Sequence, residues 1–298
     1  MKIGYPCINP SLECRSSRTF RLKNYSRERV ISTIRGNLEC LRKILRFNAE
    51  HNMMFFRITS DLIPFASHEV MDVSWQDIFK PEFEQIGSFI KEHKMRITMH
   101  PGQYTVLNSN RKEVFLKSLK DIEYHVQVLD LMDLDSAAKV QVHVGGVYGN
   151  KSKSKQRFID RYFAYESHIK NRLVIENDDK SYNLKNCLDI HQQTGIPVIF
   201  DIYHHKCNSS GESVKKAFER FSGTWKERDG IPIVHYSDEH PTKGKPSHSE
   251  HMNIENFKEF TKKTIDFDFD LMLEIKDKEK SAFKVIDILS EDPRIIKN

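Results

Sequence analysis

Short apolar runs alternate along the chain with longer segments in which apolar residues recur at helical spacing. Runs that are not interrupted by polar residues predict short strands buried on both faces. The runs that we interpret as strands are Lys2–Tyr5, Met53–Ile58, Met95–Met99, Val140–Val142, Leu173–Ile175, Pro197–Phe200, Ile231–His235 and Asp270–Leu273.

Amphipathic segments fill the stretches between these strands. The clearest contains Val30, Ile34, Leu38 and Leu41 on one face, which is the spacing of a helix. Helices are expected over Ser26–Asn48, Trp75–Lys94, Lys112–Leu131, Leu184–Gln193, Ser213–Phe221, Ile254–Thr264 and Ser281–Leu289, and a polar helix is expected after the basic loop Lys151–Arg157.

The alternation of strands with helices predicts an α/β fold with parallel strands and right-handed crossovers. About eight such units favour a closed (β/α)8 TIM barrel. No linker separates the chain into parts, so residues 1–298 are predicted to form a single domain. In such barrels functional residues lie at the carboxyl ends of the strands.

Composition narrows the class of protein. Charged residues make up 30% of the chain and hydrophobic residues 38%, which is typical of a soluble globular protein. No apolar run approaches the roughly 20 residues that span a bilayer, and the N-terminus enters a strand without a signal peptide. The five cysteines are odd in number and form no CxxC pair. This pattern predicts a reducing, intracellular, cytoplasmic location without a disulfide framework.

Metal-capable side chains follow six of the predicted strands. A carboxylate such as Glu176 at the mouth of a buried strand is costly unless a cation holds it. Asp201 and His204 add a D-x-x-H spacing that places both side chains on one helical turn. The candidate metal ligands are His100, His143, Glu176, Asp201, His204, His235, His248 and Glu274.

Imidazole with carboxylate suits Zn²⁺, Mn²⁺ or Fe²⁺. A single histidine at a strand end would more often be an ordinary packed residue, but the clustering at one face favours a metal centre. Eight ligands exceed the needs of one ion, so we expect two or three divalent ions with Glu176 as a bridging ligand. Close metal pairs suit the hydrolysis of phosphate esters.

Several loop residues have two interpretations. His68 could support a reaction or cap a loop carbonyl. Gln103 and Tyr104 could enter a base stack, although an aromatic residue packed on the barrel rim is the simpler explanation from chemistry alone. The basic segments Arg15–Lys23 and Lys151–Arg157 could contact a phosphate backbone or be solvated faces. The net charge of +5 is weak evidence for a polyanionic partner.

Seven motifs connect these residues to a known family. They are Gly4-Tyr5-Pro6-Cys7-x-Asn9, Phe56-Arg57-Ile58-Thr59-Ser60, His100-Pro101-Gly102-Gln103-Tyr104, His143-Val144-Gly145-Gly146, Leu173-Val174-Ile175-Glu176-Asn177-Asp178-Asp179, Phe200-Asp201-x-x-His204-His205 and Leu273-Glu274-Ile275-Lys276-Asp277-Lys278-Glu279. With these motifs the chain resembles the UV-damage endonuclease family over essentially its whole length.

The resemblance implies a TIM barrel similar to endonuclease IV, with a metal cluster that prefers Mn²⁺ and for which Zn²⁺, Mg²⁺ and Co²⁺ are alternatives. It implies incision of duplex DNA immediately 5′ to cyclobutane pyrimidine dimers, 6-4 photoproducts and some other lesions. Metal-dependent phosphodiester hydrolysis would leave a 3′-hydroxyl and a 5′-phosphate. UV-damaged double-stranded DNA is the expected partner, no membrane is expected, and the protein is expected to be a monomer.

By the same resemblance, Gln103 and Tyr104 become a pair that probes the lesion, which reverses the interpretation from chemistry alone. Tyr5 and Asn9 are expected to contact the scissile region, and His68 to support it. The expected catalytic residues are Glu176, Glu274, His68 and Asn9, and the expected DNA contacts are Tyr5, Gln103, Tyr104, Arg15, Arg18, Lys151 and Lys153.

One position departs from the family pattern. Some relatives have a carboxylated lysine two residues before the histidine of strand seven, where this chain has Ile233. The departure affects the expected occupancy or geometry of a third metal near His204, His235 and His248. The rival functions are an abasic-site endonuclease of the endonuclease IV type, a sugar isomerase built on the same barrel, and a damage-binding barrel with weakened catalysis.

Overall fold

Eight parallel strands form a closed barrel in which each strand pairs with its neighbour in chain order and β8 pairs with β1. The computed structural model describes residues 1–296. The strands are β1 Ile3–Pro6, β2 Phe55–Ile58, β3 Arg96–Met99, β4 Lys139–His143, β5 Leu173–Glu176, β6 Val198–Asp201, β7 Ile233–Tyr236 and β8 Asp270–Leu273. The predicted TIM barrel is therefore confirmed.

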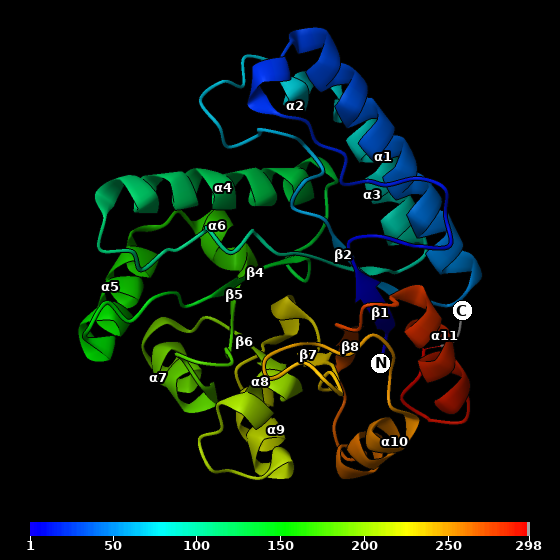
Figure 1. Ribbon diagram of the computed structural model, residues 1–298, viewed down its shortest axis with the longest axis vertical. Helices are drawn as coiled ribbons and strands as arrows, with labels where there is room; N and C mark the ends of the chain where they lie inside the picture. The colour runs from blue at the N-terminus through cyan, green and yellow to red at the C-terminus, as the bar shows by residue number, and fades with distance from the viewer. Residues whose placement is uncertain (297–298) are drawn as a thin grey trace.

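Helices surround the barrel in chain order (Figure 1). They are α1 Arg27–Glu50, α2 Trp75–Ile78, α3 Lys80–Glu92, α4 Lys112–Leu131, α5 Lys151–Ala164, α6 Ser167–Arg172, α7 Leu184–Thr194, α8 Ile202–Cys207, α9 Val214–Ser222, α10 Ile254–Lys263 and α11 Glu279–Ile288, with 3-10 turns at Leu22–Asn24 and Glu227–Asp229. Within residues 1–296, no helix is both long and apolar enough to cross a membrane.

The barrel separates two apolar layers. Inside it, Phe55, Val174, Ile199, Ile233 and Met272 form a cluster of their own, and each is fully buried. A much larger cluster lies outside, between the strands and the helices. Strands buried on both faces explain why the sequence shows continuous apolar runs rather than alternation.

Three helix predictions need correction. The segment predicted as one helix, Trp75–Lys94, is split into α2 and α3. Pro81 lies in the first turn of α3, where its missing N–H is tolerated but where it prevents continuation from the preceding turn. The predicted loop Lys151–Arg157 is the first half of α5, because Asn150 caps that helix by accepting a hydrogen bond from the Lys153 backbone N–H. Helix α8 was predicted only as one turn.

One disulfide is present although the cysteine pattern predicted no disulfide framework. Cys14, in the loop after β1, is bonded to Cys40 on α1, and the two residues are separated by 26 positions. Cys7, Cys187 and Cys207 remain free. The pairing joins a loop to a helix face, so no short cysteine motif in the sequence indicates it.

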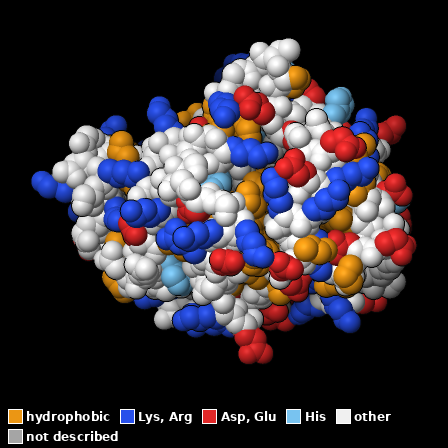
Figure 2. Space-filling view, turned by 90° about the horizontal axis from the view of Figure 1, so that it is seen from below, with side chains coloured by type: hydrophobic (Ala, Val, Ile, Leu, Met, Phe, Trp, Pro, Cys, Tyr) orange, Lys and Arg blue, Asp and Glu red, His pale blue; other side chains and the backbone are white. Residues whose placement is uncertain are grey.

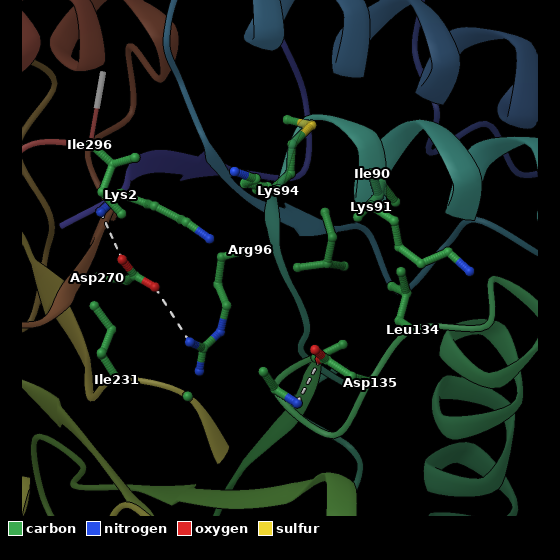
Figure 3. A pocket seen from close by; sticks show the side chains of 15 residues that line it. Lys2, Ile90, Lys91, Lys94, Arg96, Leu134, Asp135, Ile231, Asp270 and Ile296 are labelled. Carbon is green, nitrogen blue, oxygen red and sulfur yellow. Dashed lines mark hydrogen bonds and ion pairs between the residues drawn. The ribbon is translucent and has the colours of Figure 1, made fainter. Parts of the chain in front are cut away.

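The amino-terminal end of the barrel is closed by buried ion pairs. Arg96 at the start of β3 pairs with Asp270 of β8 at 3.4 Å, and Lys139 of β4 pairs with Asp229 at 2.6 Å. Arg96 and Asp270 line a cavity of about 430 Å³ at this end, into which Lys2 also extends (Figure 3). The cavity contains none of the predicted site residues.

Candidate metal centre at the carboxyl ends of the strands

Strands β3 to β8 each place one metal-capable side chain at the carboxyl end of the barrel. His100 comes directly after β3, and Glu274 comes directly after β8. The last residues of β4, β5 and β6 are His143, Glu176 and Asp201, respectively, and His235 lies within β7. The register aligns His143 with Glu176 and Asp201 with His235. Because all strands run in the same direction, their carboxyl ends meet at one face of the barrel.

The first metal-capable group contains His100, His143 and Glu176, whose ligand atoms lie within 4.8 Å of one another. The Nε2 atoms of His100 and His143 lie 3.8 and 3.9 Å from Glu176 Oε2. His100 Nδ1 lies 2.8 Å from the Pro101 carbonyl oxygen, which orients the ring so that Nε2 faces the acid. A hydrogen bond of this kind to the second ring nitrogen is usual for histidines that bind metals.

The second group contains Glu176, Asp201, His235 and Glu274, again within 4.8 Å. His235 Nδ1 lies 2.9 Å from Glu176 Oε1, 3.4 Å from Glu274 Oε1 and 4.0 Å from Asp201 Oδ2. Glu176 is the one member common to both groups. Its two carboxylate oxygens face different groups, which is the geometry expected of a bridging ligand.

His204 and His248 lie beside these groups and belong to neither. His204 Nδ1 is 3.0 Å from the Asn177 carbonyl oxygen, and His248 Nδ1 is 2.8 Å from that of Glu274. The two rings have centroids 6.1 Å apart. Each ring therefore keeps Nε2 for a ligand, while Ile233, inside the barrel core, supplies nothing to this position.

Burial and neighbouring charges favour the metal-binding protonation state at His100, Glu176 and Glu274, whereas burial raises the pKa of Asp201 and the neighbouring carboxylates of Asp201 and Glu176 raise that of His204 to about 9. Burial lowers the pKa of His100 to about 3, so its imidazole is neutral near pH 7. Burial opposes the ionisation of Glu176, but the surrounding imidazoles, His235 first among them, hold its pKa well below the usual range. Glu274 is half-buried, and its pKa is lowered by the Arg57 guanidinium first and then by His235. Neutral imidazole and ionised carboxylate are the forms that bind metals.

The donor set fits divalent cations. Asp201 Oδ2 and His143 Nδ1 are buried without a hydrogen-bond partner. Unpaired buried polar atoms are costly and require an explanation. A cation held by the second group would satisfy Asp201 Oδ2, and the mixture of imidazole and carboxylate suits Zn²⁺, Mn²⁺ or Fe²⁺.

Arg57 is a site residue that the sequence pattern did not identify. It lies in β2, and its Nη2 atom is 2.7 Å from Glu274 Oε1 and 3.0 Å from His235 Nε2. Gln141 of β4 was also missed, and its Nε2 donates to Glu176 Oε2 at 3.1 Å. An arginine and a glutamine inside apolar strand runs are the sequence signals that could have found them.

Three predicted residues, Tyr5, Asn9 and His68, belong to neither metal-capable group of the described residues. Tyr5 is fully buried, and its hydroxyl donates to Asn48 and accepts from the Asn9 amide. Asn9 is also buried, at 2% exposure, so neither side chain is exposed in the free protein and their contacts with DNA stay predictions. His68 Nδ1 accepts from the Val70 backbone N–H at 3.0 Å. That contact is local to its own loop.

The predicted lesion-probing pair projects from the protein. The Thr105 backbone N–H donates to the Gly102 carbonyl oxygen at 2.9 Å, which closes a tight turn with Gln103 and Tyr104 at its tip. Tyr104 is 83% exposed, the highest value among the large apolar side chains that are exposed in the described residues. The turn follows His100 directly, so the tip stands beside the metal-capable groups.

The predicted basic contacts are solvent-facing. Arg15 and Arg18 are exposed in the loop after β1, and Lys151 and Lys153 are exposed in the first turn of α5. Cations at a helix N-terminus oppose the helix dipole, so Lys151 and Lys153 gain no stabilisation from the dipole of α5. On the face beyond α9 and α10, Lys and Arg are interspersed with acids instead of forming one patch (Figure 2).

Comparisons with known proteins agree on one family. The family model described as UV-endonuclease UvdE matches residues 1–297. A UV DNA damage endonuclease of Clostridium perfringens is 44% identical over 98% of this chain and 71% of its own length. One from Bacillus cereus is 31% identical over 97% of this chain and 95% of its own.

Solved structures agree as well. The crystal structure of SacUVDE matches with a TM-score of 0.93 and 44% identity over 98% of both chains. Endonuclease IV from Thermus thermophilus matches with a TM-score of 0.59 and 16% identity, over 85% of this chain and 95% of that one. At that identity the second likeness concerns the fold alone.

Proposed function

The chain belongs to the UV-endonuclease UvdE family, and on this basis we propose that it is a DNA repair endonuclease acting on UV-damaged double-stranded DNA. The observation that carries the proposal is the position of Glu176, whose carboxylate is common to two metal-capable groups at the carboxyl end of the barrel. A sugar isomerase on the same barrel would not need an exposed tip such as Gln103-Tyr104.

Two or three divalent ions would be held by the predicted ligands. His100, His143 and Glu176 would hold one, and Glu176, Asp201, His235 and Glu274 a second. His204 and His248 are the protein ligands for a third. Bound divalent ions supply a nucleophile at neutral pH and neutralise charge on the attacking and leaving oxygens of a phosphodiester.

The protein's own residues organise the reaction around these positions. Arg57 fixes Glu274 and His235 through contacts of 2.7 and 3.0 Å, so that the ligand atoms of both face the second group. Burial of Glu176 and Asp201, which are 1% and 0% exposed, keeps water away from the base of the centre. The exposed lysines of α5 and the arginines of the loop after β1 would contact phosphates and set the register of the duplex.

The finer activity follows from the same proposal. The enzyme cuts immediately 5′ to cyclobutane pyrimidine dimers, 6-4 photoproducts and some other lesions, leaves a 3′-hydroxyl and a 5′-phosphate, and prefers Mn²⁺. We expect a monomer that acts in the cytoplasm. The probing tip and the metal-capable groups beside it support damage-directed hydrolysis, since opening a damaged base pair costs less than opening an intact one.

A plasmid-nicking assay tests the proposal. Supercoiled plasmid is irradiated, left intact or depurinated, and each form is incubated with the protein with and without Mn²⁺. Nicking of the irradiated plasmid but not of the intact plasmid, in the presence of Mn²⁺, is the expected result. Nicking of the depurinated plasmid alone would identify an abasic-site endonuclease, and binding of irradiated DNA without nicking would identify a damage-binding barrel. Equal nicking of irradiated and intact DNA would refute the damage specificity.

A further inference from the structure

A second cavity adjoins the metal-capable groups. It has a volume of about 620 Å³ and lies between the carboxyl ends of β1, β2 and β8 and the loop after β7. Arg57, His248 and Glu274 line it and also belong to, or contact, the candidate metal centre. The remaining charged side chains in its wall are Lys243, Lys276 and Lys278.

The cations in this wall are unequally paired. Arg57 pairs with Glu274 at 2.7 Å. Lys276 and Lys243 share a single acid, Glu250, at 2.6 and 3.9 Å. Lys278 has no carboxylate within ion-pair distance in the described part of the chain, although it is half-buried. Burial lowers the pKa of its ammonium group, although the more distant Glu274 and Glu279 act in the opposite direction, so Lys278 lacks the direct ion pair that the other cations of this wall have.

The backbone at Lys278 is also unfavourable for lysine. Its φ and ψ angles are 52° and −115°, a combination that suits glycine and that other residues adopt at a cost. Lys278 is the N-cap of α11 and makes no capping hydrogen bond with its side chain. Ser, Asp or Asn would cap this helix, and a cation is disfavoured at a helix N-terminus.

Three local preferences are therefore contradicted at one position. A glycine would relieve the turn, a short polar residue would cap the helix, and an acid would suit its dipole. When local preferences are overridden without a compensating contact inside the protein, the position is expected to serve function. An anion from outside the protein would supply the direct ion pair that Lys278 lacks.

We propose that Lys278 binds a phosphodiester group of the DNA backbone in this cavity, with its ammonium group against a non-bridging oxygen. The inference rests on the proposed function and adds a named substrate contact to it. A phosphodiester is the appropriate anion because the cavity shares His248 and Glu274 with the metal centre, so the strand to be cut passes its mouth. Arg57 cannot take this role, because it is buried and already paired with Glu274.

Two substitutions separate charge from backbone strain. Lys278→Gly removes both, and Lys278→Met removes the charge while keeping the strained backbone. The matched control is Lys280→Ala, which removes an exposed lysine two residues further along α11 that does not line the cavity. Each full-length variant is stripped of metal with a chelator, and binding to an irradiated duplex is measured over a range of salt concentrations.

The expected results are specific. Each phosphate contact contributes about 0.9 to the slope of log affinity against log salt, so both Lys278 variants should lose about that much slope and Lys280→Ala should lose none. Lys278→Gly should melt at the same temperature as the wild type or higher, because the strain is relieved. Nicking of irradiated plasmid should fall in both Lys278 variants.

Three outcomes would overturn the inference. An unchanged slope in both Lys278 variants, with wild-type protein that binds and nicks irradiated DNA, would refute the phosphate contact and leave the proposed function intact. A lower melting temperature for Lys278→Gly would show that Lys278 stabilises the fold instead. Wild-type protein that neither binds nor nicks irradiated DNA would refute the proposed function together with the inference.

Discussion

Replacement of both tip residues, Gln103→Ala with Tyr104→Ala, should remove lesion recognition without disturbing the metal centre. The tip is held from below, because Thr105 donates through Oγ1 to Asp121 and the Val106 backbone N–H donates to Ser118. The turn is therefore pre-organised, and truncation at its apex leaves its base unchanged.

The expected loss follows from the exposure of the tip. Tyr104 is 83% exposed in the free protein, so nearly all of its ring is available to stack on a base. Stacking contributes about 1–3 kcal/mol per base, and a hydrogen bond from Gln103 contributes about 0.5–1.5 kcal/mol. Together the two substitutions should weaken binding to lesion DNA by about 1.5–4.5 kcal/mol, which is roughly 10- to 2,000-fold.

Binding to matched damaged and undamaged duplexes at one salt concentration tests this prediction. Chelated protein is used so that no cleavage occurs. Affinity for undamaged DNA should hardly change, since phosphate contacts come from residues outside the tip. Phe163→Ala is the matched control, because Phe163 is also an exposed aromatic residue, at 57% exposure, but lies on α5 away from the tip.

The ratio of the two affinities decides the outcome. If the double variant keeps the wild-type ratio, another part of the barrel face senses the lesion. If affinity for both duplexes falls equally, the tip contributes general DNA affinity and no discrimination. A metal titration of the double variant completes the test, and it should match the wild type because His100 precedes the tip.

Three further predictions concern the metal centre and the closed end of the barrel. Glu176→Gln should weaken metal binding at both groups, while damaged DNA still binds. Nicking should fall by more than the ~10–100-fold that follows the loss of a residue that only supports a metal ligand. Substantial nicking by this variant in metal-replete buffer would contradict the prediction. Ile233 stands where some relatives have a carboxylated lysine, so the site at His204 and His248 lacks that ligand. Calorimetry should therefore show two tightly bound ions and one weaker ion, and three equally tight ions would contradict the prediction. Burial lowers the pKa of Lys139 to about 8, below its usual 10.5, so between pH 8 and 10 the unfolded chain holds a proton that the fold does not. As pH rises over this range, the unfolding free energy of the wild type should increase relative to that of Lys139→Met, by up to about 1.4 kcal/mol per pH unit. A difference between the two proteins that does not change with pH in urea unfolding would refute the lowered pKa of Lys139.

The barrel was predictable because its strands are short, apolar and regularly spaced. Sequence periodicity could not locate the helix boundaries and the contacts that depend on single residues. Pro81 divides a continuous helical pattern into α2 and α3, and Asn150 starts α5 earlier than its basic composition suggests. The disulfide between Cys14 and Cys40 depends on how the loop after β1 lies against α1, which no local pattern determines.

The acids and histidines of the site were predictable for a geometric reason. Parallel strands bring their carboxyl ends to one face, so a side chain such as His143 or Glu176 at a strand end is placed by topology alone. Arg57 escaped this reasoning because it lies within β2 and reaches the site through the length of its side chain. Tyr5 was given a DNA contact from its motif, whereas its burial against Asn48 depends on the packing of β1 on α1.

The cations at the two ends of the barrel differ in whether a carboxylate pairs with them. At the amino-terminal end, Arg96 and Lys139 are buried and each is paired with an aspartate, which fits a role in stability. At the carboxyl end, Lys153 stands at a helix N-terminus and Lys278 occupies a strained N-cap, both against local preference. A fold selected for stability alone would place neither lysine there. Both positions are consistent with the proposed function, in which their partner would be the phosphate backbone of DNA.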